Sequence, residues 1–161
     1  MMMKRWIGRL FLAASLACSA IVAPVSINGA GSADAKVPAA KIGENTVKLE
    51  IASSQAEIEK GLMFRTSMPE DQGMVFLFHP AQPVNFWMCH TLIPLDMLFV
   101  EKGKIVKIFH DVPPCKSPNC TDCPTYPAGE GKRVTEVIEV NGGYAARHNI
   151  KEGDKVDLDL K

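Results

Sequence analysis

Residues 84–100 read VNFWMCHTLIPLDMLFV, and this stretch decides the fold of the chain. Apolar residues fill most of its positions on both sides of any strand that it could form, which indicates burial on both faces. Pro94 cannot donate to a sheet ladder and therefore marks an edge, a bulge or a break. We predict two short strands, at 84–88 and 95–101, joined through a corner at 91–94.

Asp96 is the polar exception within the second of these strands. A carboxylate in an apolar strand must find a partner or take up a proton, because burial disfavours its charged form. Arg65 offers a partner, since it follows three apolar residues at the end of a predicted helix. The simpler interpretation is a buried structural ion pair between Arg65 and Asp96. The functional interpretation is a pocket in which Arg65 holds an anionic group and Asp96 orients it or acts as a base.

The sequence on either side alternates between short apolar segments and turns. Ser54 and Glu57 form a capping box that begins a helix, which ends before Pro69, and a second short helix is expected at 144–149. Five further segments have the length and pattern of strands: 46–52, 74–78, 104–112, 134–140 and 156–160. This pattern predicts a mainly β (α+β) domain, a small barrel-like or strongly bent antiparallel sheet with one or two short helices.

The amino-terminal 35 residues have the composition of a secretory signal. A basic flank that ends at Arg9 precedes an apolar run at 10–22, and Ala33-Asp34-Ala35 offers a small-residue cleavage site. The alternatives are an uncleaved membrane anchor and a lipoprotein modified at Cys18. All three place the rest of the chain outside the cytoplasm, because the basic flank stays inside.

We therefore predict a signal peptide at residues 1–35, a linker at 36–45 and a single domain at 46–161, in a protein that is periplasmic or extracellular. The mature chain is long enough for one core but not for two. Its formal net charge of about minus two argues against nucleic acid as a partner. A membrane is expected as a partner only if the amino-terminal segment is uncleaved or lipidated.

Four cysteines follow the signal segment: Cys89, then Cys115, Cys120 and Cys123 within the proline-rich stretch 113–131. In an exported domain an even count favours disulfides, and four cysteines allow three pairings. We favour Cys115 with Cys123, because the spacing allows a comfortable ring and the flanking prolines already restrict the chain. Cys120 with Cys123 is the competing ring. A bond between Cys89 and Cys120 requires the loop to fold back over the corner between the two strands.

The same thiols could instead hold zinc. The three loop cysteines, with Cys89, His90 or His110, could supply four nitrogen and sulfur ligands, and Cys120-x-x-Cys123 has the spacing of half a zinc site. An oxidising compartment competes for these thiolates, since it favours disulfides. We therefore expect no metal and no cofactor.

A succession of motifs runs along the chain: Gly61-Leu62-Met63-Phe64-Arg65, Gly73-Met74-Val75-Phe76, Phe86-Trp87-Met88, Thr91-Leu92-Ile93-Pro94-Leu95-Asp96 and Gly153-Asp154-Lys155-Val156. In these motifs, from about residue 46 to 160, the chain resembles the domain-of-unknown-function family 192, a family of small bacterial and archaeal proteins that are often exported. The resemblance implies a single, mainly β, barrel-like domain, and it implies no activity. The chain departs from the family pattern at Cys89 and His90, where a basic residue and an asparagine are more typical.

The common catalytic signatures are absent from the sequence: it has no Gly-x-Ser-x-Gly elbow, no phosphate-binding glycine loop and no His-Glu-x-x-His helix. We therefore expect a binding or interaction module that takes an unknown small molecule or an envelope protein. Its candidate pocket residues are Arg65, Trp87, His90, Thr91 and Asp96. Within this set we expect Trp87 in the core, and His90 and Thr91 at a solvent-accessible corner.

The rival interpretation is an enzyme, an envelope hydrolase or transferase. Asp96 or His90 would act as the base, and Thr91 or Cys89 as the nucleophile. An open cleft around Asp96, with a raised pKa for its carboxyl group, would favour the enzyme. A closed, dry surround for Asp96 would count against it.

Overall fold

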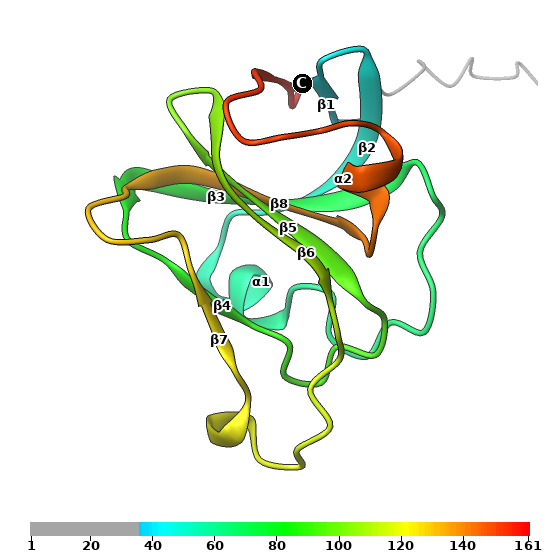
Figure 1. Cartoon of the computed structure of the whole chain (residues 1–161), viewed down its shortest axis with the longest axis vertical. Coiled ribbons are helices and arrows are strands. Elements are labelled where there is room, and N and C mark those ends of the chain that lie inside the picture. The colour runs from blue at the N-terminus through cyan, green and yellow to red at the C-terminus, as the bar shows by residue number, and fades with distance from the viewer. Residues whose placement is uncertain (1–35) are drawn as a thin grey trace, which may run out of the picture. The chain divides into compact units, whose positions relative to one another are not determined.

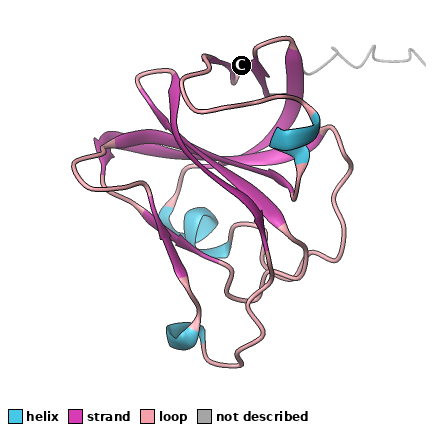
Figure 2. Cartoon of the chain, viewed as in Figure 1, coloured by secondary structure: helices cyan, strands magenta, loops and turns pink. Residues whose placement is uncertain are grey.

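A computed structural model describes residues 36–161, so the predicted signal peptide and its cleavage site lie outside the described residues. The described chain contains two short α-helices, α1 (Gln55–Lys60) and α2 (Tyr144–Arg147), and one 3-10 turn, η1 (Cys120–Asp122) (Figure 2). Its strands are β1 (Ala39–Ile42), β2 (Asn45–Ala52), β3 (Gln72–Gln82), β4 (Asn85–Trp87), β5 (Leu95–Glu101), β6 (Lys104–Val112), β7 (Thr125–Pro127), β8 (Val134–Asn141) and β9 (Val156–Asp159). None of the helices described is long and apolar enough to cross a membrane.

Seven strands form one strongly curved sheet in the order β6-β5-β8-β3-β2-β1-β9, and β4 pairs with β7 in a separate two-stranded sheet (Figure 1). The predicted mainly β fold with a bent sheet and two short helices is confirmed. Neighbouring strands of the large sheet are antiparallel except for β2 and β3, which run parallel. The sequence did not predict this pair, which arises because α1 lies in the connection between the two strands.

β1 lies within residues 36–45, so the interpretation of that segment as a linker is wrong for residues 39–42. The strand pairs with β2 on one side and with β9 on the other. Ala40 and Ile42 alternate with polar or half-buried neighbours and are fully buried. Four residues with two small or apolar positions give too weak a pattern to identify a strand from sequence.

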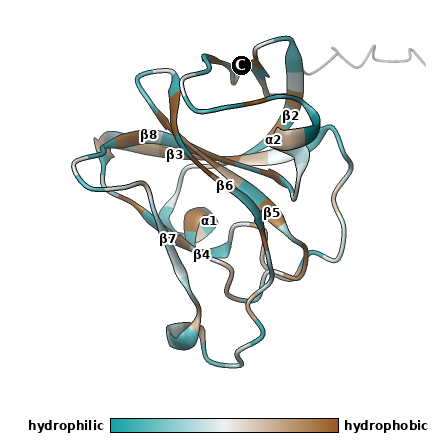
Figure 3. Cartoon of the chain, in the orientation of Figure 1, coloured by the Kyte–Doolittle hydropathy of each residue, from teal (hydrophilic) through white to brown (hydrophobic). Residues whose placement is uncertain are grey.

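The curved sheet buries an apolar cluster on each face, since successive side chains of a strand point to opposite sides. Much of the ribbon of the central strands is hydrophobic (Figure 3). Along β5, Leu98 and Val100 join the first cluster, which is covered by α2. Met97 and Phe99 join the second cluster, which lies on the side of α1 and β4. Residues 97–100 are therefore apolar throughout, because both faces of the strand are covered there.

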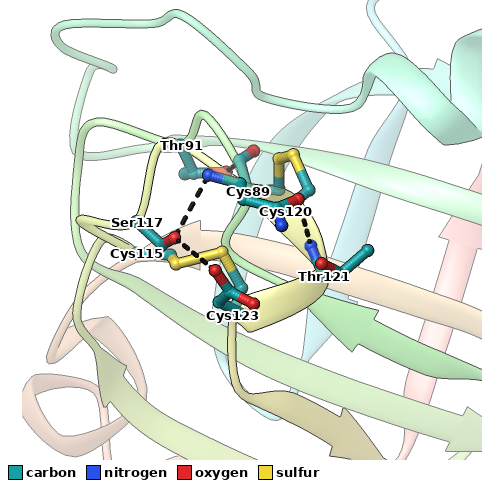
Figure 4. Close-up of a disulfide and its surroundings, with 9 residues drawn as sticks. Cys89, Thr91, Cys115, Ser117, Cys120, Thr121 and Cys123 are labelled. Carbon is teal, nitrogen blue, oxygen red and sulfur yellow. Dashed lines mark hydrogen bonds between the residues drawn. A yellow bond between two sulfur atoms is a disulfide. The ribbon is translucent and has the colours of Figure 1, made fainter.

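The proline-rich segment 113–131 is held to the rest of the domain by strand pairing and by one disulfide, and a second disulfide lies within it. β7 pairs with β4, which gives this segment a short strand that the sequence did not predict. The structure brings Cys115 and Cys123 together, the pair that we favour from the sequence, and also joins Cys89 to Cys120 (Figure 4). The loop therefore folds back over the corner that follows β4.

Replacing Cys89 and Cys120 together by alanine is expected to lower the free energy of unfolding by about 3 to 4 kcal/mol, because their bond closes the longer loop in the chain-entropy description. The sequence separation is 31 residues for this pair and 8 for the pair of Cys115 and Cys123. The same replacement at Cys115 and Cys123 should therefore lower stability less, by about 2 to 3 kcal/mol. Urea unfolding without reductant measures both values. A larger loss for the shorter loop would contradict the expectation.

Candidate functional site

A pocket of about 200 Å³ opens between α1, β4 and the large sheet. The walls are formed by α1 with the turn that follows it, and by β4 with the corner that follows it. Phe76 of β3 and Glu139 of β8 line it from the sheet. The pocket thus lies on the face that carries the second apolar cluster.

The wall at α1 is fixed by a capping box at one end of the helix and a glycine at the other. Glu57 accepts hydrogen bonds from the backbone amides of Ser53 and Ser54, at 3.0 and 2.8 Å, and these bonds lower the pKa of its carboxyl group to about 2. This confirms the predicted capping box. At the other end, Gly61 has a φ of +43°, and a Cβ there would lie 3.1 Å from the ring of Phe76. The glycine allows the backbone to approach the sheet side of the pocket.

The wall at β4 is anchored by Phe86. Its ring packs edge-to-face on Phe76 and Phe99, with centroid distances of 5.0 and 5.7 Å. Trp87 is 45% exposed, so the prediction that it belongs to the core is wrong. A two-stranded sheet that packs one face on the core cannot bury two successive residues, and Trp87 instead lines the pocket.

Glu139 provides a buried acid at the sheet side of the pocket. It is 4% exposed, and its neighbours across the sheet are Met74 on β3 and Met97 on β5. Burial raises the pKa of its carboxyl group to about 8. The described part of the chain has no fully enclosed polar side-chain atom that lacks a hydrogen bond. The carboxyl group has no ion pair there, and it faces the space of the pocket.

Sequence reasoning missed Glu139, because its strand is buried on both faces. Val134–Asn141 forms a strand, and period-two alternation places Glu139 on the same face as Val137, which is fully buried. Glu136 falls on the opposite face and is only half-buried. From the sequence alone the face of Glu139 is the more polar one, because it also carries Thr135 and Asn141, so Glu139 would have been assigned to solvent.

Asp96 is enclosed and serves the fold. Its side chain is fully buried and accepts hydrogen bonds from the backbone amides of Asp111 at 2.6 Å, Gly143 at 2.9 Å and Ala145 at 2.7 Å. These bonds tie β5 to the end of β6 and to the beginning of α2. The surround of Asp96 is closed, which counts against a role as a catalytic base.

The predicted ion pair between Arg65 and Asp96 is wrong. Arg65 instead pairs with Glu50 of β2 through two hydrogen bonds of 2.5 Å. This pairing lowers the pKa of the Glu50 carboxyl group. The side chains of Arg65 and Glu50 are 32% and 49% exposed, so the pair joins the turn after α1 to β2 at the surface.

The candidate set from the sequence is divided between different places. Trp87 and Thr91 line the pocket, whereas Arg65, His90 and Asp96 are not among its lining residues. His90 is exposed as expected, but Thr91 is only 5% exposed and its hydroxyl donates to the carbonyl of Cys89 at 3.4 Å. The buried acid that lines the pocket is Glu139, which was not in the set.

The proposed nucleophiles are also engaged. The sulfur of Cys89 is bonded to Cys120, so it offers no thiolate while that bond is intact. The hydroxyl of Thr91 points to a backbone carbonyl, and Asp96 is held by backbone amides. The residues named for an enzyme therefore do not form a nucleophile and base pair in this structure.

The model of domain-of-unknown-function family 192, described as "Uncharacterized ACR", matches residues 38–158. The chain belongs to this family. A crystal structure of a protein of unknown function from Novosphingobium aromaticivorans is 37% identical, with a TM-score of 0.65, over 74% of this chain and 83% of that one. A structure from Sinorhizobium meliloti, named as a proposed transcription regulator, is 28% identical, with a TM-score of 0.66, over 76% and 94%. No curated protein matches the chain.

Membership in family 192 confirms the resemblance seen in the sequence motifs. The family brings a fold and no assigned activity. Function must therefore be argued from the pocket and its chemistry.

Proposed function

We propose that this protein is an exported binding protein whose pocket takes a small organic cation, an amine with an apolar body. The observation that supports this best is the Glu139 carboxyl group, which faces an otherwise largely apolar pocket and has no ion-pair partner among residues 36–161. Export rests on the signal-like composition of residues 1–35.

The energetics of a buried acid favour a cationic ligand. Glu139 holds its proton up to a pH of about 8, because the empty pocket solvates a carboxylate poorly. An ammonium group in contact with the carboxyl would stabilise its charged form and displace the proton. A neutral ligand gains only an ordinary hydrogen bond from the same group, which contributes about 1 kcal/mol.

The walls suit the same class of ligand. Phe76, Phe86 and Trp87 all line the pocket, and aromatic ring faces attract cations. Glu59 and Lys60 at the edge of the pocket carry opposite charges that offset each other. The net negative charge that faces a bound cation therefore comes from the ionised form of Glu139. A volume of about 200 Å³ lies below the range of roughly 300–1,000 Å³ typical of sites for drug-sized ligands, so the ligand should be small.

Benzylamine is expected to raise the melting temperature of the mature protein more than benzyl alcohol does, because only the amine can form an ion pair with Glu139. The two probes share the ring and differ in the ionisable group. Titration calorimetry in buffers of different ionisation enthalpy should also detect release of a proton on binding of the amine at pH 7, since Glu139 must ionise.

Glu139→Gln tests the anchor directly, because it keeps the size and polarity of the side chain and removes the charge. We expect it to weaken amine binding at least tenfold, which corresponds to a loss of about 1.4 kcal/mol or more. Glu136→Gln on the opposite face of β8 is the matched control and should bind like the wild type. Equal binding of amine and alcohol, or unchanged binding by Glu139→Gln, would overturn the proposal.

A further inference from the structure

Three potential metal ligands meet beside the pocket: Cys89, His90 and Cys120. Their ligand atoms all lie within 4.8 Å of one another. Cys89 and His90 belong to the corner after β4, and Cys120 begins η1 in the folded-back loop. In the structure the two sulfurs form a disulfide, so they can bind a metal only after that bond is reduced (Figure 4).

The position of His90 is braced by Phe64. Both residues have left-handed backbone conformations, with φ of 52° and 65°, which non-glycine residues adopt at a cost. The Phe64 amide donates to the His90 carbonyl at 2.8 Å, and the two rings stack with centroids 5.1 Å apart. These contacts hold the exposed imidazole beside the two sulfurs. The side chain of His90 therefore loses less conformational entropy when a metal binds.

The folded-back loop has attachments to the rest of the domain besides the bond between Cys89 and Cys120. Cys123 ends η1 and is bonded to Cys115, whose amide donates to the carbonyl of Met88 at 3.4 Å. The pairing of β7 with β4 provides a second attachment. Cys120 is therefore held near Cys89 by contacts other than their own bond.

We propose that Cys89, His90 and Cys120 form a redox-controlled site for a thiophilic metal ion, for which Zn²⁺ is the test ion. A dithiol reductant converts the disulfide to two thiols and is itself oxidised to a disulfide, so two electrons and two protons pass to the protein. On metal binding each thiol releases its proton, and two thiolates and one neutral imidazole bind the ion.

This ligand set leaves one coordination position open. Zinc is tetrahedral, and sites with three protein ligands keep a water molecule in the fourth position. Cys89 also lines the pocket, so the metal would lie at the pocket wall. The set is smaller than the zinc site considered from the sequence, because Cys115 and Cys123 are bonded to each other. Glu139 is not one of the three ligands, so the metal site does not rest on the proposed amine site.

The test titrates Zn²⁺ against a chromophoric chelator, with the mature protein reduced at Cys89 and Cys120 while the bond between Cys115 and Cys123 stays intact, as peptide mapping verifies, and, as a control, fully oxidised. We expect one equivalent of zinc on the reduced chain and none on the oxidised chain. Co²⁺ should give thiolate-to-metal charge-transfer absorption only in the reduced state. Zinc bound equally by the oxidised protein, or no stoichiometric zinc on the reduced protein, would overturn the proposal. So would a reduced chain whose circular dichroism shows it unfolded even with zinc.

Variants locate the ligands. Cys89→Ala with Cys120→Ala should abolish zinc binding, and His90→Ala should weaken it at least tenfold. Cys115→Ala with Cys123→Ala is the matched pair, and it should retain one equivalent. His79→Ala, at another exposed histidine, should behave like the wild type. Loss of zinc with the Cys115 and Cys123 pair but not with Cys89 and Cys120 would place the metal elsewhere and exclude the proposed site.

Discussion

Asp96→Ala is expected to lower the free energy of unfolding by about 4 to 6 kcal/mol, because it removes the acceptor of three backbone amides at once. The carboxylate accepts from Asp111, Gly143 and Ala145 at 2.6 to 2.9 Å, and its side chain has no exposure to solvent. A hydrogen bond to a charged group contributes about 1.5 to 3 kcal/mol, and amides left unsatisfied in the interior add a desolvation penalty. Local movement of the end of β6 should recover part of the loss.

Asp96→Asn should lower the free energy of unfolding less than Asp96→Ala does, since the side-chain amide keeps one acceptor oxygen. It should still destabilise the fold, because its NH₂ group turns a donor toward backbone amides. Asp157→Ala is the matched control, because Asp157 is exposed on β9, and it should change stability by no more than about 0.5 kcal/mol. Urea unfolding followed by circular dichroism measures all three. An effect of Asp96→Ala as small as that of the control, together with a loss of ligand binding, would return Asp96 to the functional site.

The contrast between Asp96 and Arg65 explains why the predicted ion pair failed. The sequence identified Asp96 correctly as a buried carboxylate that needs partners. Its partners are backbone amides 15, 47 and 49 residues away, and a backbone amide has no side-chain signature that a sequence could display. Arg65 was the conspicuous cation, but it pairs with Glu50 of β2, where both side chains remain partly solvated.

The fold was more predictable than the site because local patterns encode strands and caps directly. Pro94, the capping box at Ser54 and the apolar alternation in β2 and β8 all have local physical causes. The pocket depends on how α1 and β4 come to lie over the same sheet face, which the parallel pairing of β2 with β3 determines. Trp87 and Thr91 were found because they belong to the decisive stretch, and Glu139 was missed because it lies outside it.

The stability of the wild-type protein is expected to fall as the pH rises from about 4.5 to 8, through the titration of Glu139. In the folded state its carboxyl group keeps its proton up to a pH of about 8, whereas the unfolded chain releases it near 4.5. Between these values the unfolded state binds fewer protons than the folded state, so the free energy of unfolding decreases with pH. The contribution of Glu139 to the free energy of unfolding is fully present below pH 4.5 and is lost above pH 8. The total decrease between these two pH values is about 5 kcal/mol at most.

Glu139→Gln should remove this slope, because the amide cannot ionise. At pH 5 the variant and the wild type should have similar stability, and at pH 9 the variant should be more stable by about 3 to 5 kcal/mol. The charged groups of α1 that line the same pocket, Glu59 and Lys60, are exposed and remain in both proteins, so they cancel in the difference. The acid-side titration of Glu57, whose pKa is about 2, lies outside the window.

Urea unfolding at pH 5, 7 and 9 measures the difference between the two proteins, and Glu136→Gln serves as the control that should keep the wild-type slope. Saturating benzylamine should reduce the wild-type loss at pH 9, because the bound ammonium stabilises the carboxylate. Parallel stability profiles for the wild type and Glu139→Gln would show that the Glu139 carboxyl group is solvated in the empty pocket. In that case the unfavourable burial that makes Glu139 complementary to a cation would be absent.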